Sequence, residues 1–134
     1  MPRVQGLLRH DRPQIEVAIP LFGTGRDQVR HLVADTGAGT LVDVFELILD
    51  EEDCLQCGGI PIHLVRLSGA FAGEFPVYLV DVRLPQLEFD DSVPVVGVPK
   101  VPRGFDGIAC FRFLSRFVYG NAGDRSLFVL ETPH

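Results

Sequence analysis

Short apolar runs, each bounded by glycine or proline, are the feature of this sequence that most limits what it can fold into. The chain has 134 residues, with 14 glycines and 10 prolines, and no apolar run approaches the roughly 18 residues of a membrane helix. Short runs rich in Val, Leu, Ile and Phe between turn residues are typical of an all-β domain. We therefore expect strands at residues 15–21, 29–34, 62–67, 75–84, 93–98 and 126–130.

Two segments have apolar residues at helical spacing instead. Residues 42–54 predict a short helix. The acidic run at 50–53 would form a solvated face at the C-terminal end of that helix, where it opposes the helix dipole. Residues 105–117 predict a second helix, with Arg112 and Arg116 on its outer face. The apolar stripe of this second helix consists of Ile108, Phe111, Leu114 and Phe117.

Composition and charge argue against several classes of partner. Hydrophobic residues make up 46% of the chain, and the formal net charge is −6. An acidic chain lacks the basic face that nucleic acid or an anionic membrane surface requires, so we expect neither as a partner.

The polar N-terminus does not resemble a secretory signal, and three cysteines make an odd count, so we expect a reducing, cytoplasmic location. Residues 15–131 are interpreted as one domain, preceded by an N-terminal arm at residues 1–14.

Cys54 and Cys57 form a single CxxC pair. A zinc ribbon needs a second pair, for which only His63 and Cys110 are candidates, and a thioredoxin-like site requires a βαβ unit that the pattern of runs does not predict. We therefore expect no metal site and interpret both cysteines as loop or partly buried residues. A small metal or redox protein is a weaker alternative.

An apolar strand runs directly into Asp35-Thr36-Gly37-Ala38. The strand delivers a carboxylate into apolar surroundings, the Thr36 hydroxyl can hold the loop, and Gly37 lets a backbone or ligand approach closely because it has no Cβ. A hydrogen-bonded turn after a strand is the simpler interpretation of the same residues. His31 lies four positions earlier, and we expect it at the surface rather than acting as a catalytic base.

The Asp35-Thr-Gly-Ala38 segment resembles the active-site turn of retropepsins, the retroviral-type aspartic proteases. Residues 62–84 resemble the flap hairpin that follows this turn in the family, with the small residues at 68–74 as its tip. Residues 108–114 resemble the family's short C-terminal helix element, and residues 126–130 resemble its final strand. The resemblance therefore covers nearly the whole chain.

Four positions depart from the family pattern. Cys110 stands where the family usually has glycine, and Arg112 where it often has Asp or Asn. Gly39 and Thr40 replace two carboxylates that contact substrate backbone in viral members. The departures concern substrate contacts and leave the catalytic turn intact.

The resemblance implies a fold, an assembly and a reaction. The fold is a small, closed, barrel-like all-β acid protease domain with a flap hairpin and one or two short helices. One Asp-Thr-Gly per chain implies a two-fold homodimer, with terminal strands near residues 126–130 at the interface. The reaction is aspartic endopeptidase hydrolysis, in which the two Asp35 carboxylates share one proton and activate a water without a cofactor or metal.

The resemblance also implies the site residues. The catalytic group is Asp35, Thr36 and Gly37. A peptide or protein substrate would contact Gly37, Ala38, Gly69, Ala70, Phe71 and Ala72. A non-catalytic peptide-binding or dimerisation module on the same fold is the alternative.

Overall fold

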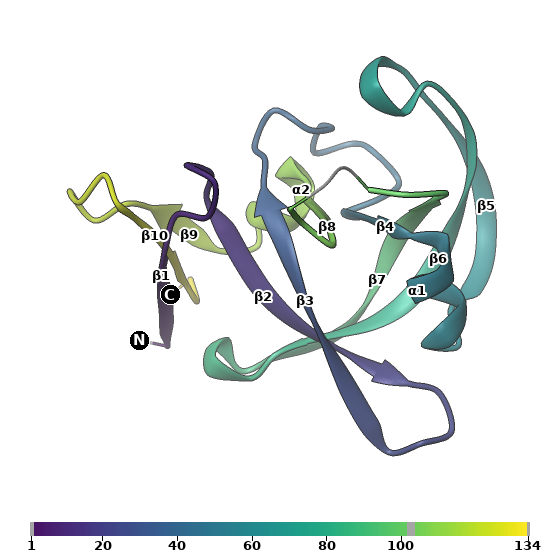
Figure 1. Cartoon of the computed structure of the whole chain (residues 1–134), viewed down its shortest axis with the longest axis horizontal. Coiled ribbons are helices and arrows are strands. Elements are labelled where there is room, and N and C mark those ends of the chain that lie inside the picture. The colour runs from purple at the N-terminus through teal and green to yellow at the C-terminus, as the bar shows by residue number, and fades with distance from the viewer. Residues whose placement is uncertain (1, 102–103, 134) are drawn as a thin grey trace.

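Six strands close into a barrel in the computed structural model, which describes residues 2–101 and 104–133 (Figure 1). They pair in the order β2-β3-β8-β4-β7-β6. The pairing of Ala18 in β2 with Arg83 in β6 closes the ring. The all-β class and the closed barrel are thus confirmed. The six strands are β2 (Gln14–Leu21), β3 (Arg26–Ala34), β4 (Leu47–Asp50), β6 (Gly73–Leu84), β7 (Phe89–Val98) and β8 (Gly107–Ala109).

A long hairpin extends from the barrel where strand β5 (Ile60–Leu67) pairs with the first half of β6. The antiparallel register runs from Ile60 opposite Leu79 to Leu67 opposite Gly73. A single 3-10 turn, η1 (Gly69–Phe71), forms the tip. The hairpin predicted at residues 62–84 is therefore present. A second 3-10 turn, η2 (Pro85–Leu87), connects β6 to β7.

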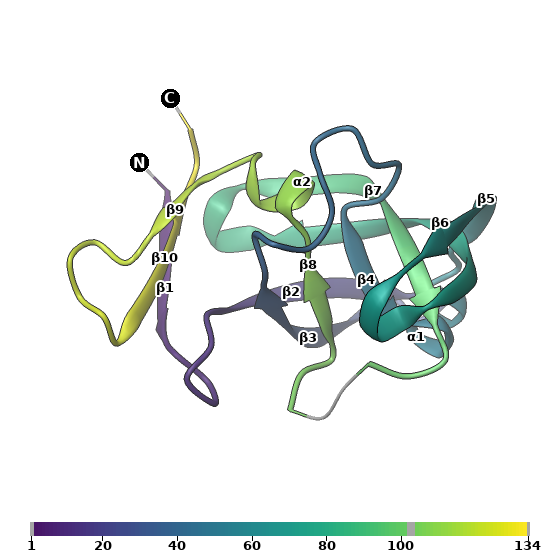
Figure 2. The same ribbon diagram turned by 90° about the horizontal axis from the view of Figure 1, so that it is seen from above.

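A second, three-stranded sheet stands beside the barrel and holds both ends of the chain (Figure 2). Its order is β1 (Arg3–Leu7), β10 (Leu127–Glu131) and β9 (Val118–Gly120). The final strand was predicted, but β1 and β9 were not. Each is short and largely exposed, so neither has the alternation that identifies a half-buried strand from sequence.

The helix predicted at residues 42–54 is wrong over its central part. Leu47, Ile48 and Leu49 are all buried and form β4, which pairs with β7 on one side and with β8 on the other. A strand covered on both faces is continuously apolar, and such a run cannot be distinguished from a buried helix by periodicity. The helix begins only after it, as α1 (Glu51–Gln56).

The acidic run consequently lies at the opposite end of its helix from the one predicted. Glu51, Glu52 and Asp53 occupy the first turn of α1, where negative charge is favourable to the helix dipole. The prediction of a solvated face is wrong for Asp53, which is buried. Its two oxygens accept hydrogen bonds from Nε and Nη2 of Arg30, both at 2.9 Å.

The second predicted helix is confirmed only for the four residues of α2 (Phe111–Leu114). The residues before it form β8, which is inserted between β3 and β4. The prediction that Arg112 and Arg116 simply face outward is also wrong. Arg112 donates a hydrogen bond to the carbonyl oxygen of Asp43, and Arg116 pairs with the buried carboxylate of Glu46.

Two apolar clusters fill the structure. The larger one lies inside the barrel and includes Phe113, Leu114 and Phe117 together with strand residues such as Leu32 and Val82. The smaller one lies between the hairpin and the loop that follows β3. Among the described residues, none of the helices has the length and apolar character needed to cross a bilayer.

Candidate active site

Asp35 follows the last residue of β3, at the end of a buried strand. Residues 32–34 are buried, and β3 pairs with β2 on one side and with β8 in parallel on the other. The Asp35 N–H donates to the carbonyl oxygen of Ala109 at 3.0 Å, and the Ala34 N–H donates to that of Pro13 at 2.9 Å. The position of Asp35 is thus determined by both neighbouring strands.

Backbone hydrogen bonds hold the loop after Asp35. The Gly37 N–H donates to Oδ1 of Asp35 at 2.9 Å, and the Ala38 N–H donates to the Asp35 carbonyl oxygen at 3.1 Å. The Ala38 carbonyl oxygen accepts the Phe111 N–H at the start of α2, at 2.9 Å. A Cβ at Gly37 would lie 3.3 Å from Oδ1 of Asp35, so glycine keeps the approach to this carboxylate open. Thr36 and Gly37 are exposed.

Asp43 is a positioning residue of this loop that the sequence did not reveal. Its Oδ2 accepts the Thr40 N–H at 2.6 Å, and its carbonyl oxygen accepts a hydrogen bond from Arg112. Gly39 adopts a φ of +75°, and a Cβ there would lie 2.9 Å from Oδ2 of Asp43. The two departures Gly39 and Arg112 therefore belong to one local arrangement. Their separation in sequence, from residue 39 to residue 112, hides this relationship.

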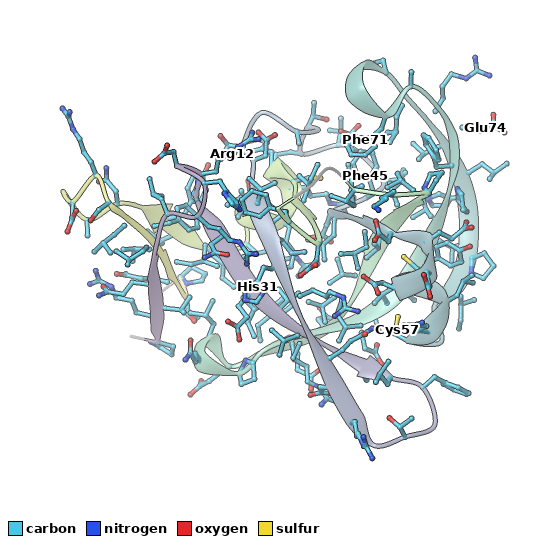
Figure 3. The ribbon with its side chains drawn as sticks, in the orientation of Figure 1. Arg12, His31, Phe45, Cys57, Phe71 and Glu74 are labelled. Atoms are coloured by element: carbon cyan, nitrogen blue, oxygen red, sulfur yellow. The ribbon has the colours of Figure 1, made fainter. Side chains whose placement is uncertain are left out.

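The structure brings only some of the predicted substrate-contacting residues together. Ala38 and Phe71 pack against the same apolar cluster, whose buried members include Phe45 (Figure 3). Gly69 and Ala72, at the hairpin tip, are exposed. The side chain of Ala70 lies outside the described part of the structure. The hairpin tip and the Asp35 loop thus both pack on one apolar cluster, the tip through Phe71 and the loop through Ala38.

A pocket of about 270 Å³ lies directly beside Asp35. Two of its residues, His10 and Arg12, come from the N-terminal arm, which the sequence had left without a role. Figure 3 shows Arg12 between the start of β2 and the end of β3. The remaining lining residues are Val33, Val101, Phe105 and Ile108.

A larger cavity, of about 550 Å³, lies elsewhere, between the three-stranded sheet and the barrel. Val4 and Leu130 line it from one side and Ile15 and Leu87 from the other. Asp35 does not line this cavity, so volume alone does not identify the chemically relevant pocket.

Cys54, Cys57 and His31 are separate from this site. Cys110 is close enough to Asp35 to be affected by its charge. Burial raises the pKa of Cys54 to about 12 and also raises the pKa of Cys57, whose Sγ donates to the Cys54 carbonyl oxygen at 3.1 Å. Burial, and then the charge of Asp35, raise the pKa of Cys110 to about 12. Within the described residues, no three His, Cys, Asp or Glu side chains are grouped as a metal would need. The partly exposed His31 ring contacts Glu16 and Asp106.

Comparisons of the chain with protein-family models, with curated proteins and with solved structures found no match. The function is therefore argued from the geometry and chemistry of the residues themselves.

Proposed function

We propose that this protein is a retropepsin-like aspartic endopeptidase that works as a homodimer. In this proposal each chain contributes Asp35 to one shared catalytic pair, and Thr36 and Gly37 shape the turn that presents it. The substrate is an extended segment of a peptide or protein. The free cysteines are compatible with work in a reducing, cytoplasmic compartment.

The observation that carries the proposal is the setting of the Asp35 carboxylate. It follows a buried strand, one of its oxygens accepts the Gly37 N–H at 2.9 Å, and a pocket opens beside it. A turn with only a structural role would not need a neighbouring pocket, or a glycine that leaves the approach to the carboxylate open. The hairpin β5–β6, whose Phe71 packs against the same apolar cluster as Ala38 of this loop, supports the role of a flap.

The proposed reaction needs one proton on the pair of carboxylates. Two carboxylates about 3 Å apart cannot both ionise, so they share a proton. The ionised member takes a proton from water as the water oxygen bonds to the peptide carbonyl carbon, and the protonated member donates its proton to the carbonyl oxygen. The tetrahedral intermediate then breaks its C–N bond: the departing nitrogen receives the proton of the pair, and one hydroxyl of the intermediate returns its proton to the pair as the carbonyl reforms. Carboxylic acid and amine leave, and the pair again holds one proton.

We place the proposed two-fold contact in the three-stranded sheet, which contains the terminal strand that the resemblance implies at the interface. β10 is the central strand of that sheet, so both of its edges already pair, with β1 and with β9. The open edges belong to β1 and β9, where Leu7, Val118 and Tyr119 are exposed. An open strand edge is a ready template for pairing with a second chain. We therefore assign the two-fold contact to one of these edges.

A non-catalytic peptide-binding module is the second candidate. The observation in its favour is that Asp35 is the only acid among the residues that line the pocket in the described structure. One carboxylate can hold a peptide but cannot perform the two-carboxylate reaction. Binding without hydrolysis would then need no second chain at the site.

The two candidates are separated by turnover and assembly measured together. Purified wild-type protein and Asp35→Asn are incubated with a denatured protein mixture from acidic to neutral pH, and products are read by mass spectrometry. We expect cleavage by the wild type with a bell-shaped pH dependence, since the pair needs one proton, and none by Asp35→Asn. Sedimentation should show a dimer for both forms. Equal cleavage by Asp35→Asn, or a wild-type monomer that cleaves, would disprove the proposed mechanism, and a dimer that binds but never cleaves would favour the binding module.

A further inference from the structure

The pocket beside Asp35 brings two basic side chains and one acid together in a molecule that is acidic as a whole. The chain has a formal net charge of −6, and the pocket is lined by Arg12 and His10 as well as by Asp35. Its remaining lining residues are apolar: Val33 and Ile108 on the barrel strands, and Val101 and Phe105. A basic group at the end of apolar walls is suited to a side chain with an aliphatic stem and an anionic head.

The strand register brings Arg12 next to Asp35. In the antiparallel pair β2–β3, Gln14 lies opposite Val33, and the Ala34 N–H donates to the Pro13 carbonyl oxygen at 2.9 Å. Two residues beyond the last pair of this ladder, the same register would set Arg12 opposite Asp35, and both residues line the pocket. The end of the β2–β3 pair therefore keeps the arginine close to the acid.

A tight turn orients His10 into the same pocket. Arg9 and Arg12 exchange two backbone hydrogen bonds, of 2.9 and 3.0 Å, around the central residues His10 and Asp11. These two residues have φ values of 52° and 60°. Turns with positive φ at both central positions favour glycine, asparagine and aspartate, and histidine is also enriched in this region, so His10 and Asp11 suit the turn.

The His10 ring is held on its other side by the loop before β8. It lies edge-on to Phe105, with ring centroids 6.2 Å apart. Gly104 has a φ of +94°, and a Cβ there would lie 3.0 Å from Cδ2 of His10. The exposed His10 ring thus lies against a segment that is nearly a hundred positions away in the sequence.

Arg12 is not held in an ion pair in the part of the chain that the structure describes, although the Asp35 carboxylate lines the same pocket. Arg30, Arg83 and Arg116 each pair with an aspartate or glutamate there, whereas no such pair involves Arg12 or His10. An arginine is always charged and offers a fork of donors that matches a carboxylate. In the proposed dimer two such arginines would face one shared negative charge on the catalytic pair, so the surroundings stay favourable to an added anion.

We propose that this pocket is a substrate subsite that selects a carboxylate-bearing side chain, glutamate or aspartate, next to the bond that is cut. Arg12 is the main specificity-determining residue, and His10 assists it. The inference rests on the proposed endopeptidase function and adds to it the class of substrate: acidic peptide segments. Val33 and Ile108 would contact the aliphatic stem, and the guanidinium would bind the head in a bidentate, charge-assisted pair.

The test uses matched peptides that differ at one position, occupied by Glu, Gln or Lys, each with a blocked C-terminus. The peptide sequence comes from a site that the wild-type protein cuts in a denatured protein mixture. We expect kcat/KM for the Glu peptide to exceed that for the Gln peptide by roughly tenfold or more, and the Lys peptide to be poorest. Arg12→Ala should reduce the Glu/Gln ratio to near one, and Arg12→Glu should invert the order of Glu and Lys. Arg9→Ala, an exposed change in the same turn outside the pocket, is the control and should keep the ratio.

The outcomes distinguish failure of the proposed subsite from failure of the proposed endopeptidase function. Cleavage by the wild type with no enrichment of acidic residues near the cut sites, or a Glu/Gln ratio that Arg12→Ala leaves unchanged, would overturn the subsite and leave the endopeptidase function standing. Loss of the dimer in Arg12→Ala, with equal losses on both peptides, would mean that the arginine serves assembly instead, and would also overturn the subsite. Cleavage that requires a free C-terminus would assign the pocket to the terminal carboxylate and reject the side-chain preference. If the wild type cleaves nothing, the proposed function itself fails.

Discussion

Arg116 and Glu46 form a bidentate ion pair across 70 positions of sequence, with Nε 2.5 Å from Oε1 and Nη2 2.8 Å from Oε2. The Glu46 carboxylate is buried, and its own backbone N–H and carbonyl bond to Pro94 and Cys110. The hydrogen bond to the Glu46 side chain and the charges of Glu46 and Asp91 raise the pKa of Arg116, and burial, which lowers it, only partly offsets them. The pair fixes the end of α2, the helix whose first N–H holds the loop of Asp35.

Arg116→Ala should therefore destabilise the fold by leaving a carboxylate buried without its partner. Because the Arg116 side chain is 35% exposed and water can partly replace it, we expect a loss of about 2 kcal/mol in the free energy of unfolding rather than the roughly 3–5 kcal/mol of a fully buried pair. Urea denaturation measures this loss. Adding Glu46→Gln to the variant should recover part of it, and Arg125→Ala, at an exposed arginine, is the control. A change below about 0.5 kcal/mol in Arg116→Ala would contradict the assignment.

Gly107→Ala should disrupt the strand that separates β3 from β4. A Cβ at Gly107 would lie 2.5 Å from both the Ile48 carbonyl oxygen and the Leu49 side chain, and the backbone atom cannot move aside cheaply. We expect a loss of about 3 kcal/mol or more in stability. Any activity should also fall, because the carbonyl of Ala109 in this strand holds the Asp35 N–H.

The matched control for Gly107 is Gly120→Ala. Gly120 is also a strand glycine, but nothing lies within 4 Å of the position that its Cβ would occupy. Its substitution should change stability by less than about 1 kcal/mol. Equal losses of stability in the two variants would show that crowding around the Cβ position of Gly107 does not cause the effect.

Two of the three cysteines should resist alkylation in the folded protein. Raised pKa values of about 12 leave Cys54 and Cys110 with roughly one thiolate in ten thousand at pH 8, and the thiolate is the form that reacts. Since both pKa values lie above the ordinary thiol value, reactivity should rise only as the pH approaches 12. Iodoacetamide at pH 8, followed by mass spectrometry, should modify the partly exposed Cys57 first and all three in denaturant. Rapid equal labelling of Cys54 and Cys57 in the native state would instead favour a redox role for the pair.

The hairpin tip should exchange its amide hydrogens faster than the barrel half of β6. Gly69, Ala72 and Gly73 are exposed, and Phe71 packs against the apolar cluster. Removing this contact in Phe71→Ala should cost the closed hairpin about 1 kcal/mol, or about a fivefold rise in exchange at the tip. Leu64→Ala, at an exposed position of the same hairpin, is the control. Strong protection at the tip in both variants would count against a flap that opens.

The retropepsin-like interpretation of Asp35 came from a local pattern, and so did most of the strands. Alternation and turn residues depend on neighbours in sequence, which is why β2, β3, the hairpin and β10 could be predicted to within a few residues. The Asp-Thr-Gly segment is equally local, because a strand, a carboxylate and a glycine are enough to define it. The structure adds the hydrogen bonds from Gly37 and Ala109 that hold this segment in place.

The tertiary structure determined the features that depend on residues far apart in the sequence. Residues 47–50 became a strand because β7 and β8 cover both of its edges, and no periodicity within the segment could reveal that. Asp53 is buried because Arg30 lies opposite it. Arg12 and Asp35 line one pocket because the β2–β3 pair ends close to both of them. The sequence by itself determined which segments are apolar, where the chain turns and which acid follows a buried strand, since these are short-range properties. Pairing, burial of charge and the lining of a pocket are long-range, and only the closed barrel could determine them.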